Sequence, residues 1–191
     1  MKGLGISCLL IVLMLTSCKS KLTTAQLQER NAQLEQLALR LDEDGYEIKM
    51  NAAYPLTTAA LNNVANGILL QTGNSANRIN LTDRHDYIKR KGDQVSADLS
   101  YFGERQIAAG YNTEAGIKFN DRTTNYSQII DTENGNIEIQ FTATDEHNEN
   151  YPVRISLTAA QTASINITSS HRTNIRYTGT LRLLEATEEV E

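Results

Sequence analysis

Apolar and polar residues alternate along most of the chain after residue 45. The alternating runs lie at 46–52, 94–101, 137–143, 153–159, 163–167 and 175–183. A period of two is typical of strands that bury one face and expose the other. Asn134-Gly135 lies between two runs in which apolar and polar residues alternate, and this placement favours a tight hairpin. The pattern predicts an all-β fold of eight or nine antiparallel strands, closed into a small barrel or a curled sheet.

A different period precedes the strands. Thr23 and Gln26 are spaced as a capping box. Leucines then follow at intervals of seven, at Leu27, Leu34 and Leu41. This pattern predicts an amphipathic helix over residues 24–44. Two heptads are too few for a convincing coiled coil, so the favoured interpretation is a helix that packs on the β domain or caps its end. A coiled-coil stalk is the alternative.

The N-terminus has the organisation of a leader for export. An apolar run of about ten residues, half of what a membrane-spanning helix needs, ends at Leu15-Thr16-Ser17-Cys18. This ending resembles the bacterial lipoprotein box, in which the thiol receives a diacylglycerol and cleavage leaves Cys18 as the first residue. An ordinary signal peptide that ends near a cysteine is the alternative. Since Cys8 lies in the leader, the mature domain is expected to hold no disulfide and no thiol nucleophile.

These patterns predict one domain with short flanking segments. The expected divisions are a removed signal peptide (1–17), a lipidated tether (18–23), a helix (24–44), a β-barrel domain (45–184) and an acidic tail (185–191). Several acyl chains on Cys18, palmitate among them, would anchor the protein firmly to the outer membrane. No acidic cluster follows Cys18, and this favours a periplasm-facing position.

The charge balance argues against one class of partner. The chain carries 18 Lys and Arg residues against 23 Asp and Glu residues. Loss of Lys2 with the leader makes the mature net charge about −6. Non-specific nucleic-acid binding depends on positive charge, so no nucleic-acid partner is expected.

No catalytic or metal-binding pattern is legible in the sequence. His85, His147 and His171 are far apart, and there is no triad signature, phosphate loop or dinucleotide fingerprint. The acidic segments 131–136 and 145–150 have some of the letters of a calcium loop. A solvated hairpin loop explains each segment without a metal. The sequence therefore predicts no cofactor, no metal site and no catalytic residue.

The segment from Leu99 to Arg105 interrupts the alternation with two adjacent aromatic residues and a glycine. In a continuing strand, Tyr101 and Phe102 would point to opposite faces. One of them could then line a pocket or an interface. The favoured interpretation is that both close one end of the core over a bend. If a ligand binds, we expect Tyr101, Phe102 and Arg105 near the mouth of the barrel.

Seven short motifs occur in a fixed order along the chain. They are Ile79-Asn80-Leu81-Thr82, Tyr87-Ile88, Lys91-Gly92-Asp93-Gln94-Val95, Leu99-Ser100-Tyr101-Phe102-Gly103-Glu104-Arg105, Gly116-Ile117-Lys118-Phe119, Ser169-Ser170-His171-Arg172 and Ile175-Arg176-Tyr177-Thr178-Gly179. Over roughly residues 46–182, the set resembles the Bacteroidota lipoproteins catalogued as domain-of-unknown-function family 4251. Ser100 stands where that family usually has proline. The resemblance implies an all-β, lipocalin-like barrel on a lipidated tether, and it implies no activity.

These observations favour a non-enzymatic binding or interaction module, anchored in the outer membrane through Cys18 and facing the periplasm. Its partner would be a small ligand or an envelope protein. The alternative is a structural or assembly protein of the outer membrane that binds other envelope proteins. A hydrolase of envelope glycans or lipids is the remote alternative, because no catalytic set is legible.

Overall fold

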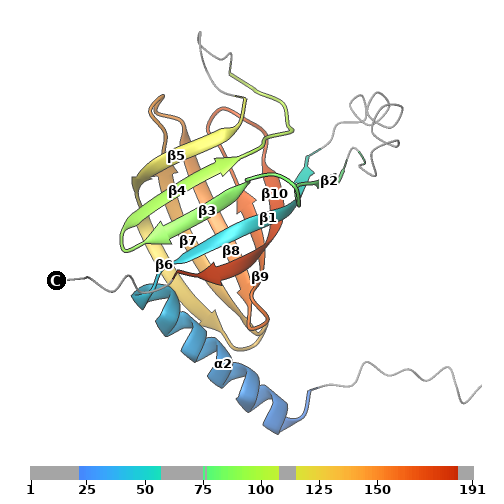
Figure 1. The fold of residues 1–191 in the computed structure, drawn as a ribbon, viewed down its shortest axis with the longest axis vertical. Helices are drawn as coiled ribbons and strands as arrows, with labels where there is room; N and C mark the ends of the chain where they lie inside the picture. Colours follow the sequence, from blue (N-terminus) through green and yellow to red (C-terminus); the bar gives the residue numbers. More distant parts are fainter. Residues whose placement is uncertain (1–21, 57–74, 76, 108–114, 185–191) are drawn as a thin grey trace, which may run out of the picture.

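The computed structural model describes residues 22–56, 75, 77–107 and 115–184. The elements are α2 (Thr24–Glu43), β1 (Tyr46–Pro55), β2 (Ile79–Asn80), β3 (Tyr87–Lys91), β4 (Gln94–Leu99), β5 (Ile117–Arg122), β6 (Thr124–Asp131), β7 (Asn136–Thr144), β8 (Asn150–Thr158), β9 (Thr162–Ile167) and β10 (Ile175–Leu183). The predicted fold class is confirmed: one helix precedes an antiparallel, nearly closed, barrel-shaped sheet (Figure 1). The two-residue strand β2 pairs with β1 beside the main path of the sheet.

The sheet runs in the order β5-β4-β3-β1-β10-β9-β8-β7-β6. Every pairing is antiparallel, so hairpins connect most neighbours. The strand β1 lies between β3 and β10, and it therefore joins the two halves of the chain. A register shift between Met50 and Ala52 marks a bulge in β1, a feature that bends a strand and increases its twist.

The two edges of the sheet, β5 and β6, are consecutive in the chain and diverge from a corner at Thr123. Near this corner, the Thr144 amide donates to Asp121 Oδ2 over 3.1 Å, which ties β7 to β5 through a side chain. Further along β6 from this corner, Gln128 donates to the Ala38 carbonyl of α2 over 3.0 Å. The helix thus lies beside the β6 edge, while the edge of β5 faces the β7–β8 hairpin.

The helix α2 packs against the end of the barrel at which the β6–β7 hairpin turns (Figure 1). It begins with the predicted capping box between Thr23 and Gln26. The later part of its apolar stripe is buried, with Leu34 and Leu41 both 0% exposed, whereas Leu27 near the start of the helix is 37% exposed. The Arg90 guanidinium reaches Asp42 over 3.3 Å and stacks on the Tyr126 ring at 4.0 Å. The leucine spacing therefore reflects packing on the domain.

The barrel interior is filled with side chains. Inward-facing residues from the long strands form one buried cluster. Large tyrosines contribute to it, and Tyr46, Tyr151 and Tyr177 are 0% exposed. Small barrels are commonly filled in this way, with interior positions alternating along each strand. Within the described residues, no helix is both long and apolar enough to cross a membrane.

The predicted strand 94–101 ends earlier than its alternation indicates. The strand β4 stops at Leu99, and the chain then leaves the sheet. The reason lies in the partners of Ser100: its amide donates to the buried Asp86 carboxylate, and its carbonyl accepts from the Tyr177 hydroxyl at 2.9 Å. These hydrogen bonds to side chains take the place of the backbone hydrogen bonds to a neighbouring strand. Tyr101 and Phe102 therefore lie beyond the strand, at the bend.

Candidate functional site

A groove of about 570 Å³ opens where the edge of β5 faces the β7–β8 hairpin. Strands β3, β4 and β5 form one side, and residues 144–147 form the other. Its chemistry is mixed, with Tyr87, Asp98, Lys118, Phe119, His147 and Arg172 among the lining residues. We call it the seam groove. Its volume lies in the range of small-ligand sites.

Both acidic and basic side chains line the seam groove, and neither sign of charge dominates. Lys118 and Asp98 form a cross-strand ion pair of 3.6 Å, and both side chains are about half exposed. Phe119 and Tyr151 lie behind this wall with their ring centroids 5.7 Å apart. A polar ligand with donors, acceptors and one apolar face would match such a surface.

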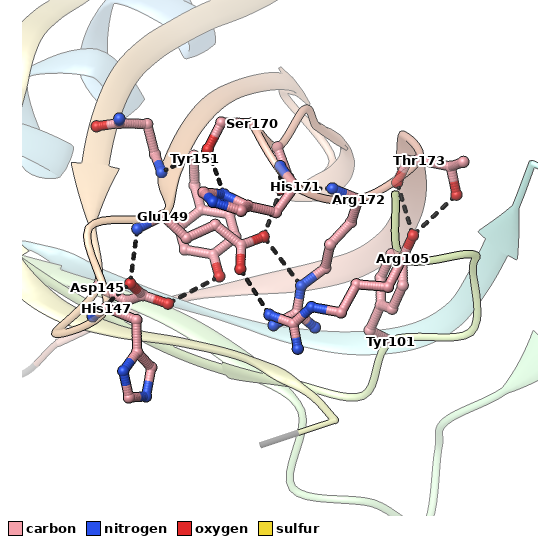
Figure 2. A network of polar contacts seen from close by, with 12 residues as sticks. Tyr101, Arg105, Asp145, His147, Glu149, Tyr151, Ser170, His171, Arg172 and Thr173 are labelled. Carbon is pink, nitrogen blue, oxygen red and sulfur yellow. Dashed lines mark hydrogen bonds and ion pairs between the residues drawn. The ribbon is translucent and has the colours of Figure 1, made fainter. Parts of the chain in front are cut away.

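A buried ion network supports the hairpin side of the groove (Figure 2). Glu149 is 1% exposed, and each of its carboxylate oxygens binds a different arginine. Arg172 Nε donates to Oε1 over 2.9 Å, and Arg105 Nη2 donates to Oε2 over 2.9 Å. The Ser169 hydroxyl also donates to Oε1. Both oxygens are occupied, so Glu149 acts as a structural anchor and not as a free base.

The electrostatics of Glu149 follow from these partners. Burial raises its pKa, but the hydrogen bond from Ser169 and the guanidinium of Arg172 lower the pKa by more. The pKa of Glu149 therefore lies below the ordinary value of 4.5. The carboxylate stays ionised at neutral pH, and the two arginines keep their counter-charge.

Asp145 shapes the hairpin that carries Glu149. One carboxylate oxygen accepts from the amides of His147 and Glu149, each at 2.9 Å. The other accepts from the Tyr151 hydroxyl at 3.1 Å.

The interpretation of residues 145–150 as a solvated loop is wrong for Glu149, because this residue is buried. The described residues contain no group of three His, Cys, Asp or Glu side chains that could hold a metal ion.

Of the three residues predicted to line a mouth, Tyr101 and Arg105 contact this network, and none of the three lines the seam groove. The Tyr101 hydroxyl contacts Thr173 Oγ1 at 2.8 Å, and the Arg172 guanidinium lies 5.2 Å from the centre of the Tyr101 ring. Arg105 binds Glu149, as described above. Phe102 is partly buried and lies 5.9 Å from the Arg84 guanidinium. The structure thus brings Tyr101 and Arg105 together, while their role in binding stays a prediction.

Sequence reasoning missed Glu149 and Arg172 as a pair. They are separated by 23 residues, and only the folded hairpin brings them to 2.9 Å. Arg172 also donates to the Ala115 carbonyl over 2.8 Å, so it ties the start of β5 to the network. The one signal available in the sequence was the Ser169-Ser170-His171-Arg172 motif. It is among the motifs that carry the family resemblance, but the sequence indicated no physical role for it.

Comparisons with known proteins identify a family and no activity. No curated protein and no solved structure matches the chain. The family model described as "Domain of unknown function (DUF4251)" matches residues 28–181. This match spans well over half of the chain and covers most of the helix, nearly all of the barrel and both arginines of the ion network. The chain therefore belongs to the DUF4251 family.

Proposed function

We propose that this protein is a non-enzymatic binding module of the bacterial envelope, and that the seam groove is its binding site. The observation that carries the proposal is the contrast between two spaces. The barrel interior is filled by a single buried cluster, while the seam groove offers about 570 Å³ at the surface. A ligand is therefore bound at the seam and not inside the barrel.

The lipid anchor belongs to the same proposal. The box that ends at Cys18 supports a lipoprotein of the kind found in Bacteroidota, attached to the outer membrane and facing the periplasm. In the sequence the tether directly precedes α2, which packs against one end of the barrel. The nine residues of β7 separate the turn beside α2 from Thr144 at the groove, a length of about 27 Å. This separation supports a binding site directed away from the membrane.

Native mass spectrometry of the protein purified from its own membranes tests the proposal. We expect a reproducible small-molecule adduct that is lost when Asp98 and Lys118 are both changed to alanine. The matched control changes Glu47 and Arg182, a second cross-strand ion pair, of 3.5 Å, on β1 and β10. An adduct that survives the groove variant, or that disappears equally in the control, contradicts the assignment.

One observation favours a second candidate, an assembly protein that binds other envelope proteins. A filled interior fits that function as well, and two large apolar side chains are exposed on neighbouring elements. Leu39 of α2 is 64% exposed, and Ile129 of β6 is 61% exposed. Under this alternative, the purified protein carries no small-molecule adduct, and a defined envelope protein dissociates from it when Ile129 is changed to Asp.

A further inference from the structure

A row of polar side chains crosses the outer face of the barrel wall, away from the seam groove. Strand register places Tyr54 of β1 opposite Arg176 of β10, and Arg176 opposite Asn166 of β9. Asn166 lies opposite Arg154 of β8, which lies opposite Gln140 of β7. Residues directly opposite each other in antiparallel strands share one face. These five residues, which we call the arginine row, therefore form one line across five adjacent strands.

The arginines of the row are exposed and form no ion pair with any of the described residues. Arg154 and Arg176 are both exposed, and neither forms an ion pair with a described carboxylate. Arg182, six residues further along β10, differs because it pairs with Glu47. The row thus presents positive charge on a protein whose net charge is negative.

A third arginine, Arg78, lies at the Tyr54 end of the row. The Arg176 guanidinium stacks on the Tyr54 ring, 4.2 Å from its centre. Arg78 also hydrogen-bonds the Tyr54 side chain. This bond is the main reason that the pKa of Tyr54 is lowered. Two guanidiniums therefore converge on one tyrosine at this end.

The middle of the row borders a second groove of about 420 Å³. Arg154, Asn166 and Gln140 line it, together with the hydroxyl-bearing Thr142 and Thr168. Amide and hydroxyl groups bind neutral polar groups, while an arginine binds an oxyanion through paired N–H donors. Guanidinium and amide alternate along the row, so an extended partner would need anionic and neutral polar groups in alternation.

The strand spacing sets the distance between the two charges. Arg176 and Arg154 are separated by one intervening strand, which places their Cα atoms about 9.5 Å apart. We propose that the arginine row binds an acidic polysaccharide, in which acidic sugars alternate with neutral ones. The guanidiniums would hold the acid groups, and Asn166 and Gln140 would bind the hydroxyls between them.

Single-stranded nucleic acid fits this surface less well. It carries a charge on every nucleotide and is bound through aromatic platforms on which successive bases stack. The only aromatic ring of the row, Tyr54, is already covered by Arg176. None of the five residues of the row lines the seam groove, so the inference stands independently of the function proposed above.

Calorimetric titration of the full chain in a neutral detergent tests the inference. The probe is hyaluronan, which has a carboxylate on every second sugar, and uncharged dextran is the polymer control. We expect binding to hyaluronan that weakens as salt is added, and no binding to dextran. Arg154→Ala and Arg176→Ala should each weaken binding about tenfold, the usual effect of losing a hydrogen bond to a charged group.

Two further variants separate charge from folding. Asn166→Asp keeps both arginines but places a negative charge between them, and it should weaken binding as much as either alanine variant. Arg182→Ala removes an exposed arginine of the same strand outside the row, and it should leave binding unchanged. Equal losses in Arg182→Ala, or no binding of hyaluronan, overturn the proposal. Tighter binding of oligothymidylate or of soluble short-chain phosphatidylglycerol than of hyaluronan overturns it in favour of those partners.

Discussion

The stability of the barrel end beside the seam groove should depend on the charge of Glu149. Glu149→Gln keeps the shape of the side chain and removes its charge. Arg172, whose side chain is 3% exposed, then loses its counter-charge, and so does the less buried Arg105. Removing one partner of a buried ion pair costs about 3–5 kcal/mol because the remaining charge stays desolvated. We expect the free energy of unfolding to fall by this amount.

Urea-induced unfolding followed by circular dichroism measures the loss. Glu146→Gln is the matched control, because it changes the same hairpin at a side chain that is 87% exposed and lies 3.6 Å from the His147 ring. Exposed ion pairs contribute about 0–1 kcal/mol, so this variant should unfold almost like the wild type. A loss below about 1 kcal/mol for Glu149→Gln would refute the reasoning, since the network would then contribute no more than a surface pair.

Acid titration checks the same network without a large structural change. The pKa of Glu149 is lower in the folded chain than its ordinary 4.5, so folding favours the ionised form. The stabilisation is fully present above the unfolded pKa and is lost as pH falls through the folded pKa. The difference in unfolding free energy between wild type and Glu149→Gln should therefore shrink as pH falls below the ordinary value of 4.5. A difference that stays constant down to pH 2 contradicts the ionic origin.

Three further predictions concern the helix, the tyrosines and the anchor. Leu41→Ala, at a fully buried position of α2, should cost about 2–5 kcal/mol by urea unfolding, while Leu39→Ala, at 64% exposure, should have almost no effect. Burial raises the pKa of Tyr126 to about 12. Its contribution to stability is therefore present below the unfolded pKa of 10 and is lost as pH rises toward 12, as thermal unfolding from pH 9 to 12 should show. Cys18→Ser should abolish the added lipid mass and release the protein from the membrane fraction, and a variant that stays membrane-bound contradicts the lipoprotein assignment.

The fold class followed from the sequence of the long strands that bury one face and expose the other, whereas the short strands β3 and β5 were not among the predicted runs. β7, β8 and β10 satisfy that condition along their length, so their alternation was clear. β6 does not, because it is an edge strand with a bulge, and all of its residues are partly or fully exposed. A strand without a buried face leaves little trace of period two, so β6 was not among the predicted runs.

The candidate site was much less predictable, because its contacts join distant parts of the chain. The ion network links Arg105, Glu149 and Arg172 across three loops, and no spacing rule connects them. The acidic letters around Glu149 indicated an exposed turn, since buried carboxylates are rare unless they are paired. The arginine row was equally hidden, because cross-strand neighbours become apparent only once the strand register is known.

The filled interior limits where any ligand of this barrel can bind. A drug-sized ligand needs about 300–1,000 Å³, so an interior site would displace several packed side chains. Returning each buried apolar side chain, such as Ile48 or Ile155, to water costs about 1.5–3 kcal/mol. Displacing four of them would cost about 6–12 kcal/mol, a range that includes the roughly 8 kcal/mol gained in micromolar binding. Sites that need no displacement, the seam groove and the arginine row, are therefore where this fold can bind a partner without unfolding its core.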